Sequence, residues 1–372
     1  MRLGREARGN NHATMTAASS AVPGPSSVPG LRFVNDGMTG FRRRRAGRGF
    51  TYLDHDGRRI EDAETLARIR GLAIPPAWTD VWICPTENGH LQATGRDARG
   101  RKQYRYHDRW RTVRDETKFE RLVDFGLALT PLRRRIERDL GGRGLTRDKI
   151  LATVLRLMDV AWARVGNVEY ARDNASFGLT TLRGRHVRVT GDRVRFEFAG
   201  KGGKVHTFGV NDERLARIVR RCKDLPGQEL FQYLDEEGER RPIGSGDVND
   251  YVRETTGGEF SAKDFRTWAG TVVAATALAA AGPVTSKRQA KGQVRRAIAV
   301  VAESLGNTPA IARASYVHPM VIEAYLDGFL VRSWARPLPH RAPRTTARLW
   351  ADEQRTLRVL RPAQRAASRR AG

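Results

Sequence analysis

The stretch Gly306–Pro319, GNTPAIARASYVHP, places a single tyrosine, Tyr316, in a short polar segment between two apolar helical runs. Thr308 and Pro309 are typical of a helix N-cap and a first helical position, so a short helix is expected to lead to Tyr316. A tyrosine that serves the core would be expected on the apolar face of a flanking helix. Whether Tyr316 serves chemistry instead depends on the rest of the chain.

The chain is strongly basic: its 372 residues carry a formal net charge of +26, and the pI is about 11.1. This excess predicts a polyanionic partner, most simply a nucleic acid backbone. The sequence shows no run of 18 apolar residues and no basic amphipathic helix near a terminus, so a membrane is the less favoured polyanionic partner. Arginine outnumbers lysine, 58 to 9, so each lysine is informative.

Two cysteines, Cys84 and Cys222, lie far apart and outside any CxxC pair. The pattern argues against a zinc site or a disulfide framework and favours a reducing cytosol, with both thiols buried as small hydrophobes.

The two ends of the chain differ in composition from its centre. Residues 1–30 are rich in Ala, Ser, Pro and Gly without the apolar core of a signal peptide, so we expect a disordered leader, and Met15 is an alternative start. Residues 331–372 hold 11 Arg and 2 acidic residues, a net charge of +9, which predicts a solvated basic tail that adds non-specific DNA affinity.

The centre of the chain divides into two predicted domains. Residues 31–114 contain short strand-like segments broken by turn signals, with one helix over DAETLARIRGL, which predicts a small β-rich domain. Residues 115–330 are mainly helical, but HVRVTGDRVRFEFAGKGGKVHTFGV alternates with period two around two glycine turns. The predicted fold is therefore α+β: a small β-rich N-terminal domain and a larger, mainly α domain with a three-stranded antiparallel sheet.

Two common ways of acting on phosphates are missing from the sequence. The segment GKGGKV lacks the upstream Gly and the Ser or Thr of a P-loop, and no carboxylate cluster marks a Mg²⁺-dependent nuclease. A basic protein without these sites can bind nucleic acid passively or attack a phosphodiester with a side chain. Attack needs a nucleophile, arginines for the non-bridging oxygens, and a proton donor for the leaving 5′ oxygen. Arginine cannot give that proton because its pKa exceeds about 12, whereas a lysine beside other cations can.

Side chains of these types occur in five separate segments. Taken singly, each has an ordinary structural interpretation, because most tyrosines pack or lie at a surface and most lysines in glycine turns are simply exposed. Together they supply a complete set for phosphoryl transfer: Arg164, Lys201, Arg266, Asn307 and Tyr316.

With these residues in this order, the chain from Leu31 to Leu330 resembles the type IB DNA topoisomerases, specifically their poxvirus-like bacterial branch. The resemblance rests on RVGNVEYARDNASFGLTTL, the GK turn, KDFRTW, GRKQYRYH and the tyrosine segment with its spacing from Asn307. It implies that Tyr316 is the nucleophile of a 3′-phosphotyrosyl bond and that Lys201 is the general acid.

The same resemblance implies that Arg164, Arg266 and Asn307 contact the scissile phosphate. Viral members of the family carry His where this chain has Asn307. The resemblance therefore implies that Asn307 donates a hydrogen bond to the phosphate, but it implies no proton transfer by this residue. The family also implies a C-shaped clamp around double-stranded DNA, with one domain on each face of the duplex.

Further DNA contacts are expected outside the catalytic set. Alternation puts Tyr104 and Tyr106 on one strand face, where aromatic and amide side chains could meet base edges. Lys263 belongs to the KDFR segment, and His318, beside Pro319, is interpreted as structural. The expected DNA contacts are Gln103, Tyr104, Tyr106, Tyr170 and Lys263.

The resulting hypothesis is a monomeric, cytoplasmic, nucleoid-associated bacterial enzyme that relaxes supercoiled DNA. No cofactor is expected: the covalent bond would store the phosphodiester energy without ATP, and Mg²⁺ could stimulate through DNA electrostatics without being required. A tyrosine recombinase is one alternative, although that family usually has His-x-x-Arg where this chain has Lys263 to Arg266. A non-catalytic basic nucleic-acid-binding protein is the other.

Overall fold

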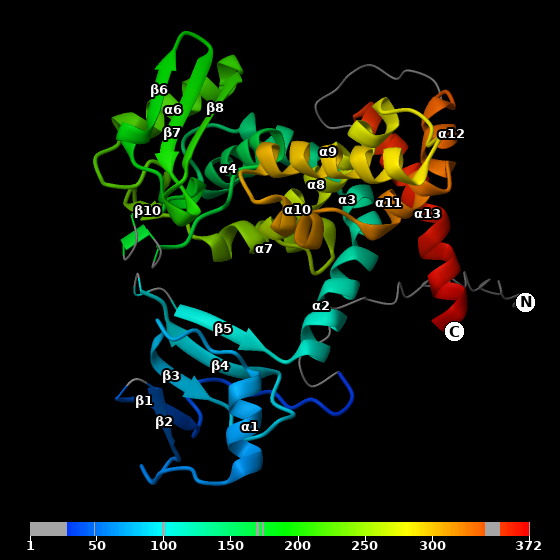
Figure 1. The fold of residues 1–372 in the computed structure, drawn as a ribbon. Coiled ribbons are helices and arrows are strands. Elements are labelled where there is room, and N and C mark those ends of the chain that lie inside the picture. Colours follow the sequence, from blue (N-terminus) through cyan, green and yellow to red (C-terminus); the bar gives the residue numbers. More distant parts are fainter. Residues whose placement is uncertain are drawn as a thin grey trace, which may run out of the picture.

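The structure, a computed structural model, describes residues 28–338 and 350–371 except 48, 99, 101, 169, 170, 173 and 174. The chain forms a small lobe and a large lobe joined by one helix (Figure 1). Most of the expected leader, and Tyr170, lie outside the described residues. Val28 is buried against Leu31 and Trp110, so the packed chain begins earlier than residue 31.

The small lobe is a five-stranded antiparallel sheet with one helix packed on it, in the order β2-β1-β3-β4-β5. Ile69 of the helix is buried against Val81, Ile83 and Ala93 of the sheet. Strand β5 lies at the edge nearest the large lobe (Figure 1). The elements are β1 (Phe41–Ala46), β2 (Gly49–Leu53), α1 (Ala63–Gly71), β3 (Thr79–Ile83), β4 (Leu91–Arg96) and β5 (Lys102–Tyr106).

Helix α2 (Asp108–Glu120) runs from the end of β5 into the large lobe (Figure 1). The domain boundary expected between residues 114 and 115 therefore falls inside the helix that joins the two lobes. A charged helix without an apolar periodicity gives no boundary signal, because its course is decided by the lobes at its two ends.

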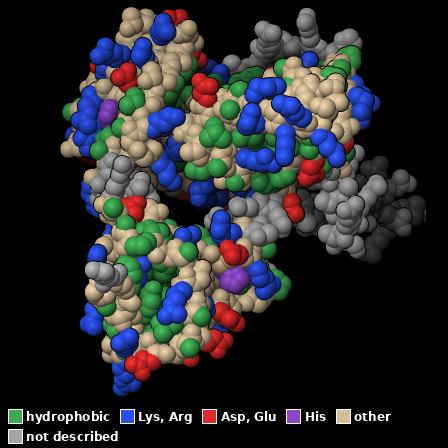
Figure 2. Space-filling view, in the orientation of Figure 1, with side chains coloured by type: hydrophobic (Ala, Val, Ile, Leu, Met, Phe, Trp, Pro, Cys, Tyr) green, Lys and Arg blue, Asp and Glu red, His purple; other side chains and the backbone are tan. Residues whose placement is uncertain are grey.

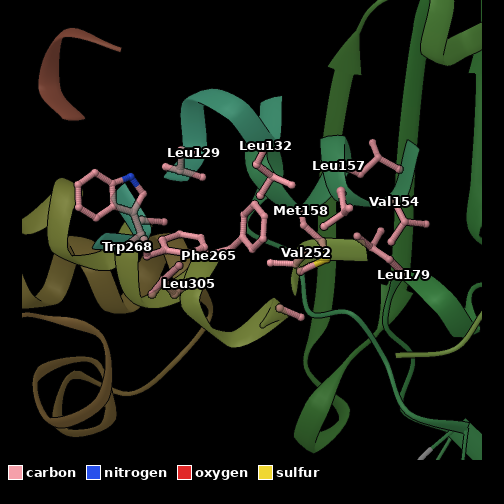
Figure 3. Packing of buried hydrophobic residues seen from close by; sticks show 14 of the residues in the cluster. Leu129, Leu132, Val154, Leu157, Met158, Leu179, Val252, Phe265, Trp268 and Leu305 are labelled. Atoms are coloured by element: carbon pink, nitrogen blue, oxygen red, sulfur yellow. The ribbon is translucent and has the colours of Figure 1, made fainter. Parts of the chain in front are cut away.

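The large lobe is mainly helical, and its core is formed by α3, α4 and α8 with helices packed around them (Figure 3). The sheet β6-β7-β8 stands with α6 at one end of this lobe (Figure 1). The elements are α3 (Leu122–Leu140), α4 (Arg147–Ala161), η2 (Leu179–Thr181), η3 (Gly184–His186), β6 (Val187–Thr190), β7 (Arg193–Ala199), η4 (Lys201–Gly203), β8 (Val205–Asn211), α6 (Glu213–Asp224), β9 (Gln232–Leu234), β10 (Arg240–Pro242), α7 (Ser245–Thr256), α8 (Ala262–Ala280), α9 (Lys287–Leu305), α10 (Pro309–Tyr316), α11 (Pro319–Leu326), α12 (Phe329–Ala335) and α13 (Ala351–Ala371).

The C-terminal segment is part of this lobe, so the expectation of a solvated basic tail from residue 331 onward is wrong. Leu357, Val359 and Leu360 of α13 are buried in the large core. Glu353 is 2% exposed and accepts hydrogen bonds from Arg133 at 2.8 and 2.9 Å. The high net charge of the segment indicated a solvated tail. Its few apolar residues and one acid become buried only through contacts with the rest of the lobe.

Arg133 of α3 links three helices through ionic hydrogen bonds. It is 2% exposed and donates to both carboxylate oxygens of Asp159 on α4, each at 2.8 Å, as well as to Glu353. The indole nitrogen of Trp268 on α8 also donates to Glu353, at 2.9 Å. Removing one carboxylate would leave a buried cation with half of its partners, which is costly in a low-dielectric interior.

Substituting Glu353→Ala is expected to lower the free energy of unfolding by about 3–5 kcal/mol, because the Arg133 charge is left under-compensated. The matched control is Asp352→Ala, the neighbouring acid, whose pair with Arg355 is more exposed and is expected to cost less than about 1 kcal/mol. Urea unfolding of the two variants checks this. Equal losses would show that α13 is not held through Glu353.

Candidate active site

Tyr316 is the last residue of α10 and lies directly against α8. The expected N-terminus of α10 is confirmed: Thr308 is the N-cap, its side chain accepts from the Ile311 amide, and Pro309 follows. Gly270 of α8 allows the close approach, because a Cβ there would lie 2.6 Å from the carbonyl oxygen of Tyr316. The Thr271 hydroxyl donates to the same carbonyl at 3.2 Å. The nucleophile candidate thus sits on a fixed helix junction.

The Arg266 side chain lies beside the Tyr316 phenol. It comes from α8, one turn before Gly270, is 6% exposed, and its guanidinium carbon is 5.2 Å from the centroid of the Tyr316 ring. It donates to the carbonyl oxygens of Leu305, at 2.6 Å, and Trp162. Its Nε has no hydrogen-bond partner within the described residues. A buried cation with a donor to spare is suited to an anionic ligand.

The carbonyl of Trp162 is available to Arg266 because of an unusual backbone turn. Trp162 ends α4 in the left-handed region, with φ of 52°. Such a conformation is rare for a bulky residue and stays only where its surroundings hold it. Two residues later, Arg164 leaves the turn and reaches the C-terminal end of α9.

Arg164 and Asn307 are joined by a direct hydrogen bond. The Arg164 guanidinium donates to the Asn307 side-chain oxygen at 2.9 Å. Asn307 follows Gly306, the left-handed C-cap of α9. The backbone N–H of Asn307 donates to the carbonyl oxygen of Ala302 at 2.8 Å. The amide side chain is thereby oriented by the end of a helix.

Lys201 comes from the turn between β7 and β8. Gly202 and Gly203, with φ of 80° and 77°, allow the chain to reverse there, and the lysine is exposed. A cleft of about 230 Å³ is lined by Lys201 together with Arg164 and Arg266. The fold therefore brings Arg164 against Asn307 and Arg266 against Tyr316, and Lys201 lines the same cleft as the two arginines.

Several cations change the ionisation of Tyr316. Burial of the phenol opposes its ionisation, but Arg266, followed by Arg164 and Lys118, outweighs burial and lowers the pKa of Tyr316. Burial in turn, aided by Arg164, lowers the pKa of Arg266 to about 10. A phenol with a lowered pKa is easier to convert to a nucleophilic phenolate.

Two side chains at this site were not expected from the sequence. Lys118 of α2 donates to the carbonyl oxygen of Ser315, and its Nζ lies 5.8 Å from the Tyr316 ring centroid. His206 of β8 lines the same cleft as Lys201. The scarcity of lysine in an arginine-rich chain was a signal for Lys118, whereas nothing local distinguished His206.

The expected DNA contacts lie mostly on the small lobe, on β5. Tyr104 and Tyr106 share one face as predicted, with their rings stacked at 6.0 Å and 10°. Gln103 donates to the Asp97 carboxylate at 2.9 Å, so its amide is engaged within the lobe. Lys263 is exposed at the start of α8, close in sequence to Arg266.

Comparisons with known proteins match both lobes to one family. Residues 107–329 match the catalytic core of eukaryotic DNA topoisomerase I, and residues 49–97 match the N-terminal domain of bacterial DNA topoisomerase IB. The chain is 32% identical over 298 residues to DNA topoisomerase 1B of Acanthamoeba polyphaga mimivirus, which is 77% of this chain and 88% of the relative. The chain belongs to the type IB DNA topoisomerases.

More distant relatives of this topoisomerase are viral as well. The chain is 23% identical over 239 residues to DNA topoisomerase I of Monkeypox virus and to DNA topoisomerase 1B of Vaccinia virus (strain Copenhagen), covering 63% of this chain and 72% of each relative. Membership of this family favours neither the recombinase nor the passive binder.

None of the described helices combines the length and apolarity needed to cross a membrane. Among the described residues, no group of three or more His, Cys, Asp or Glu is arranged to hold a metal ion.

His318, two residues after the tyrosine, is the N-cap of α11. Its Nδ1 accepts from the Met320 amide at 3.1 Å, and its ring lies 5.3 Å from that of Phe119. This local role agrees with the structural interpretation. Burial lowers the pKa of His318 to about 4, so the neutral ring is favoured in the folded state.

Acidification is expected to destabilise the protein through His318. Its folded pKa lies below the unfolded value of about 6.5, so its contribution is complete above pH 6.5 and is lost as the pH falls toward 4. Between pH 7 and pH 5 the loss is about 1–2 kcal/mol. His318→Asn keeps a good N-cap without a titrating group, so urea unfolding should show a smaller loss for the variant over this interval. An equal loss of unfolding free energy for both proteins over this interval would contradict the role given to His318.

Proposed function

We propose that this type IB topoisomerase relaxes supercoiled double-stranded DNA by cutting one strand with Tyr316, letting the duplex swivel, and resealing it. The observation that carries this proposal is the contact of the Tyr316 phenol with the buried Arg266 guanidinium, beside the Arg164–Asn307 pair. A nucleophile and three donors for phosphate oxygens then converge from four separate segments.

The scissile phosphate would bind where these donors meet. The unpartnered Nε of Arg266 would donate to one non-bridging oxygen, while the Leu305 and Trp162 carbonyls hold the guanidinium in place. Arg164 and the Asn307 amide would serve the other oxygen. Charge that develops on these oxygens during attack is stabilised by groups already oriented, which avoids reorganisation at the moment of reaction.

The chemical step exchanges one phosphodiester for another. The Tyr316 oxygen attacks phosphorus and loses its proton to solvent, the bond from phosphorus to the 5′ oxygen breaks, and Lys201 protonates the departing 5′ oxygen. The 3′ phosphate is left joined to Tyr316. Resealing reverses each move: the 5′ hydroxyl returns its proton to Lys201 and attacks, and Tyr316 leaves. Because the number of phosphoester bonds is unchanged, the cycle needs no ATP, and no metal ion takes part in a step.

The two lobes suit a clamp formed by one chain around a duplex. Figure 2 shows an opening between the lobes, with lysine and arginine side chains along the edge of the large lobe. Tyr104 and Tyr106 on β5 would contact the duplex from the small lobe. We further propose that the enzyme acts as a monomer in a bacterial cytoplasm, associated with the nucleoid, where Mg²⁺ could stimulate it through DNA electrostatics.

Tyr316→Phe is expected to abolish relaxation of a supercoiled plasmid in the absence of ATP, because the attacking oxygen is gone while the ring volume stays. The variant should still bind duplex DNA and should form no covalent adduct in denaturant. Normal relaxation by this variant would refute the mechanism. A recombinase would require paired specific sites, and a passive binder would leave the linking number unchanged.

Lys201→Ala is expected to slow single-turnover cleavage by about 10²–10⁴-fold on ordinary DNA, the usual contribution of a general acid. A substrate with sulfur at the bridging 5′ position should restore its rate, because a thiolate leaves without a proton. Arg266→Ala should stay slow on both substrates, since its guanidinium serves the non-bridging oxygens. If Lys201→Ala is equally slow on both substrates, Lys201 is not the general acid.

A further inference from the structure

His206 occupies a distinct place at the base of the turn that carries Lys201. It pairs with Phe198 across β7 and β8, and the two rings stack with centroids 5.8 Å apart. Residues 201–205 are all exposed, whereas His206 is half-buried. Along β8, His206 is therefore the first residue after the turn that packs on the body of the lobe.

Two glycines make room for this imidazole. A Cβ on Gly200 would lie 2.3 Å from its Cδ2, and a Cβ on Gly306 would lie 2.8 Å from its Cε1. The ring is thus held between the residue that precedes Lys201 and the residue that precedes Asn307. The atoms nearest to both Cβ positions belong to this ring, so the ring acts as the spacer between the two segments.

The electrostatic surroundings favour the neutral form of this spacer. Burial, followed by Arg164, Arg266 and Lys204, lowers the pKa of His206. A permanently charged side chain in the same place would be repelled by two arginines of the phosphate site. An uncharged planar ring can fill the gap without disturbing them.

We propose that His206 is a positioning residue for Lys201, whose ring sets the distance between the lysine turn and the phosphate site. The inference rests on the proposed function, because it acts through the proton transfer assigned to Lys201. Without the ring, the exposed turn loses its contact with the end of α9, and Lys201 can no longer be held in reach of the leaving oxygen. A misplacement of about 1 Å can cost a catalytic group about 10²-fold in rate.

The test compares single-turnover cleavage of ordinary DNA with cleavage of DNA that has sulfur at the bridging 5′ position. His206→Ala is expected to cleave ordinary DNA about 10–100-fold more slowly than wild type, and to approach the wild-type rate on the sulfur substrate. The matched control is Val205→Ala, an exposed neighbour on the same strand, which should cleave both substrates at the wild-type rate. Activity on the sulfur substrate also shows that each variant is folded.

A second variant separates the contact made by the ring from its nitrogens. His206→Phe keeps a neutral planar ring between the two glycines and is expected to stay within about 3-fold of wild type on ordinary DNA, well inside the loss that misplacement causes. The proposal is overturned if His206→Ala is equally slow on both substrates, or if the Phe variant is as slow as the Ala variant.

The outcome for Lys201→Ala distinguishes a failure of the His206 proposal from a failure of the general-acid assignment. If sulfur rescues Lys201→Ala but not His206→Ala, the general acid stands and only the role of His206 fails. If sulfur rescues neither variant, the assignment of the general acid fails and the role of His206 fails with it.

Discussion

A buried guanidinium that is held by carbonyl oxygens, Arg266, is the constraint on which the active site depends. The carbonyls of Leu305 and Trp162 fix its position but carry no full charge to compensate it. Burying such a cation is unfavourable, which is why its pKa falls to about 10. The same positive charge lowers the pKa of Tyr316, and the Nε of Arg266 has no hydrogen-bond partner within the described residues. In the proposed function, a bound phosphate would compensate this buried charge.

Arg133 shows how the same lobe treats an arginine whose role is structural. Asp159 and Glu353 each give it a bidentate partner, and its pKa is raised despite burial. Both arginines are buried in the large lobe, yet only Arg133 is neutralised by carboxylates. The indole of Trp268, two residues after Arg266, donates to Glu353. The ion-pair cluster around Arg133 therefore also contacts α8, the helix that carries Arg266.

Helix α2 connects the small lobe to the candidate active site. It leaves the small lobe after β5, and near its C-terminal end Lys118 donates to the carbonyl of Ser315, next to Tyr316. The ammonium also contributes to the lowered pKa of Tyr316. Lys118 therefore links α2 both to the backbone beside Tyr316 and to the electrostatic surroundings of its phenol.

The sequence by itself was enough to predict which side chains would carry the chemistry. Tyr316, Asn307 and the arginines lie in short segments whose order and residue types match the needs of phosphoryl transfer, and helix caps such as Thr308 are local in sequence. Only the tertiary structure decided that α13 belongs to the core, that α2 crosses the expected boundary, and that Lys118 and His206 join the site. Arg133 and Glu353 are 220 residues apart, and Lys118 and Ser315 are 197 apart. Contacts over such separations leave no periodic pattern in the chain, because each partner acquires its role only when folding brings it to the other.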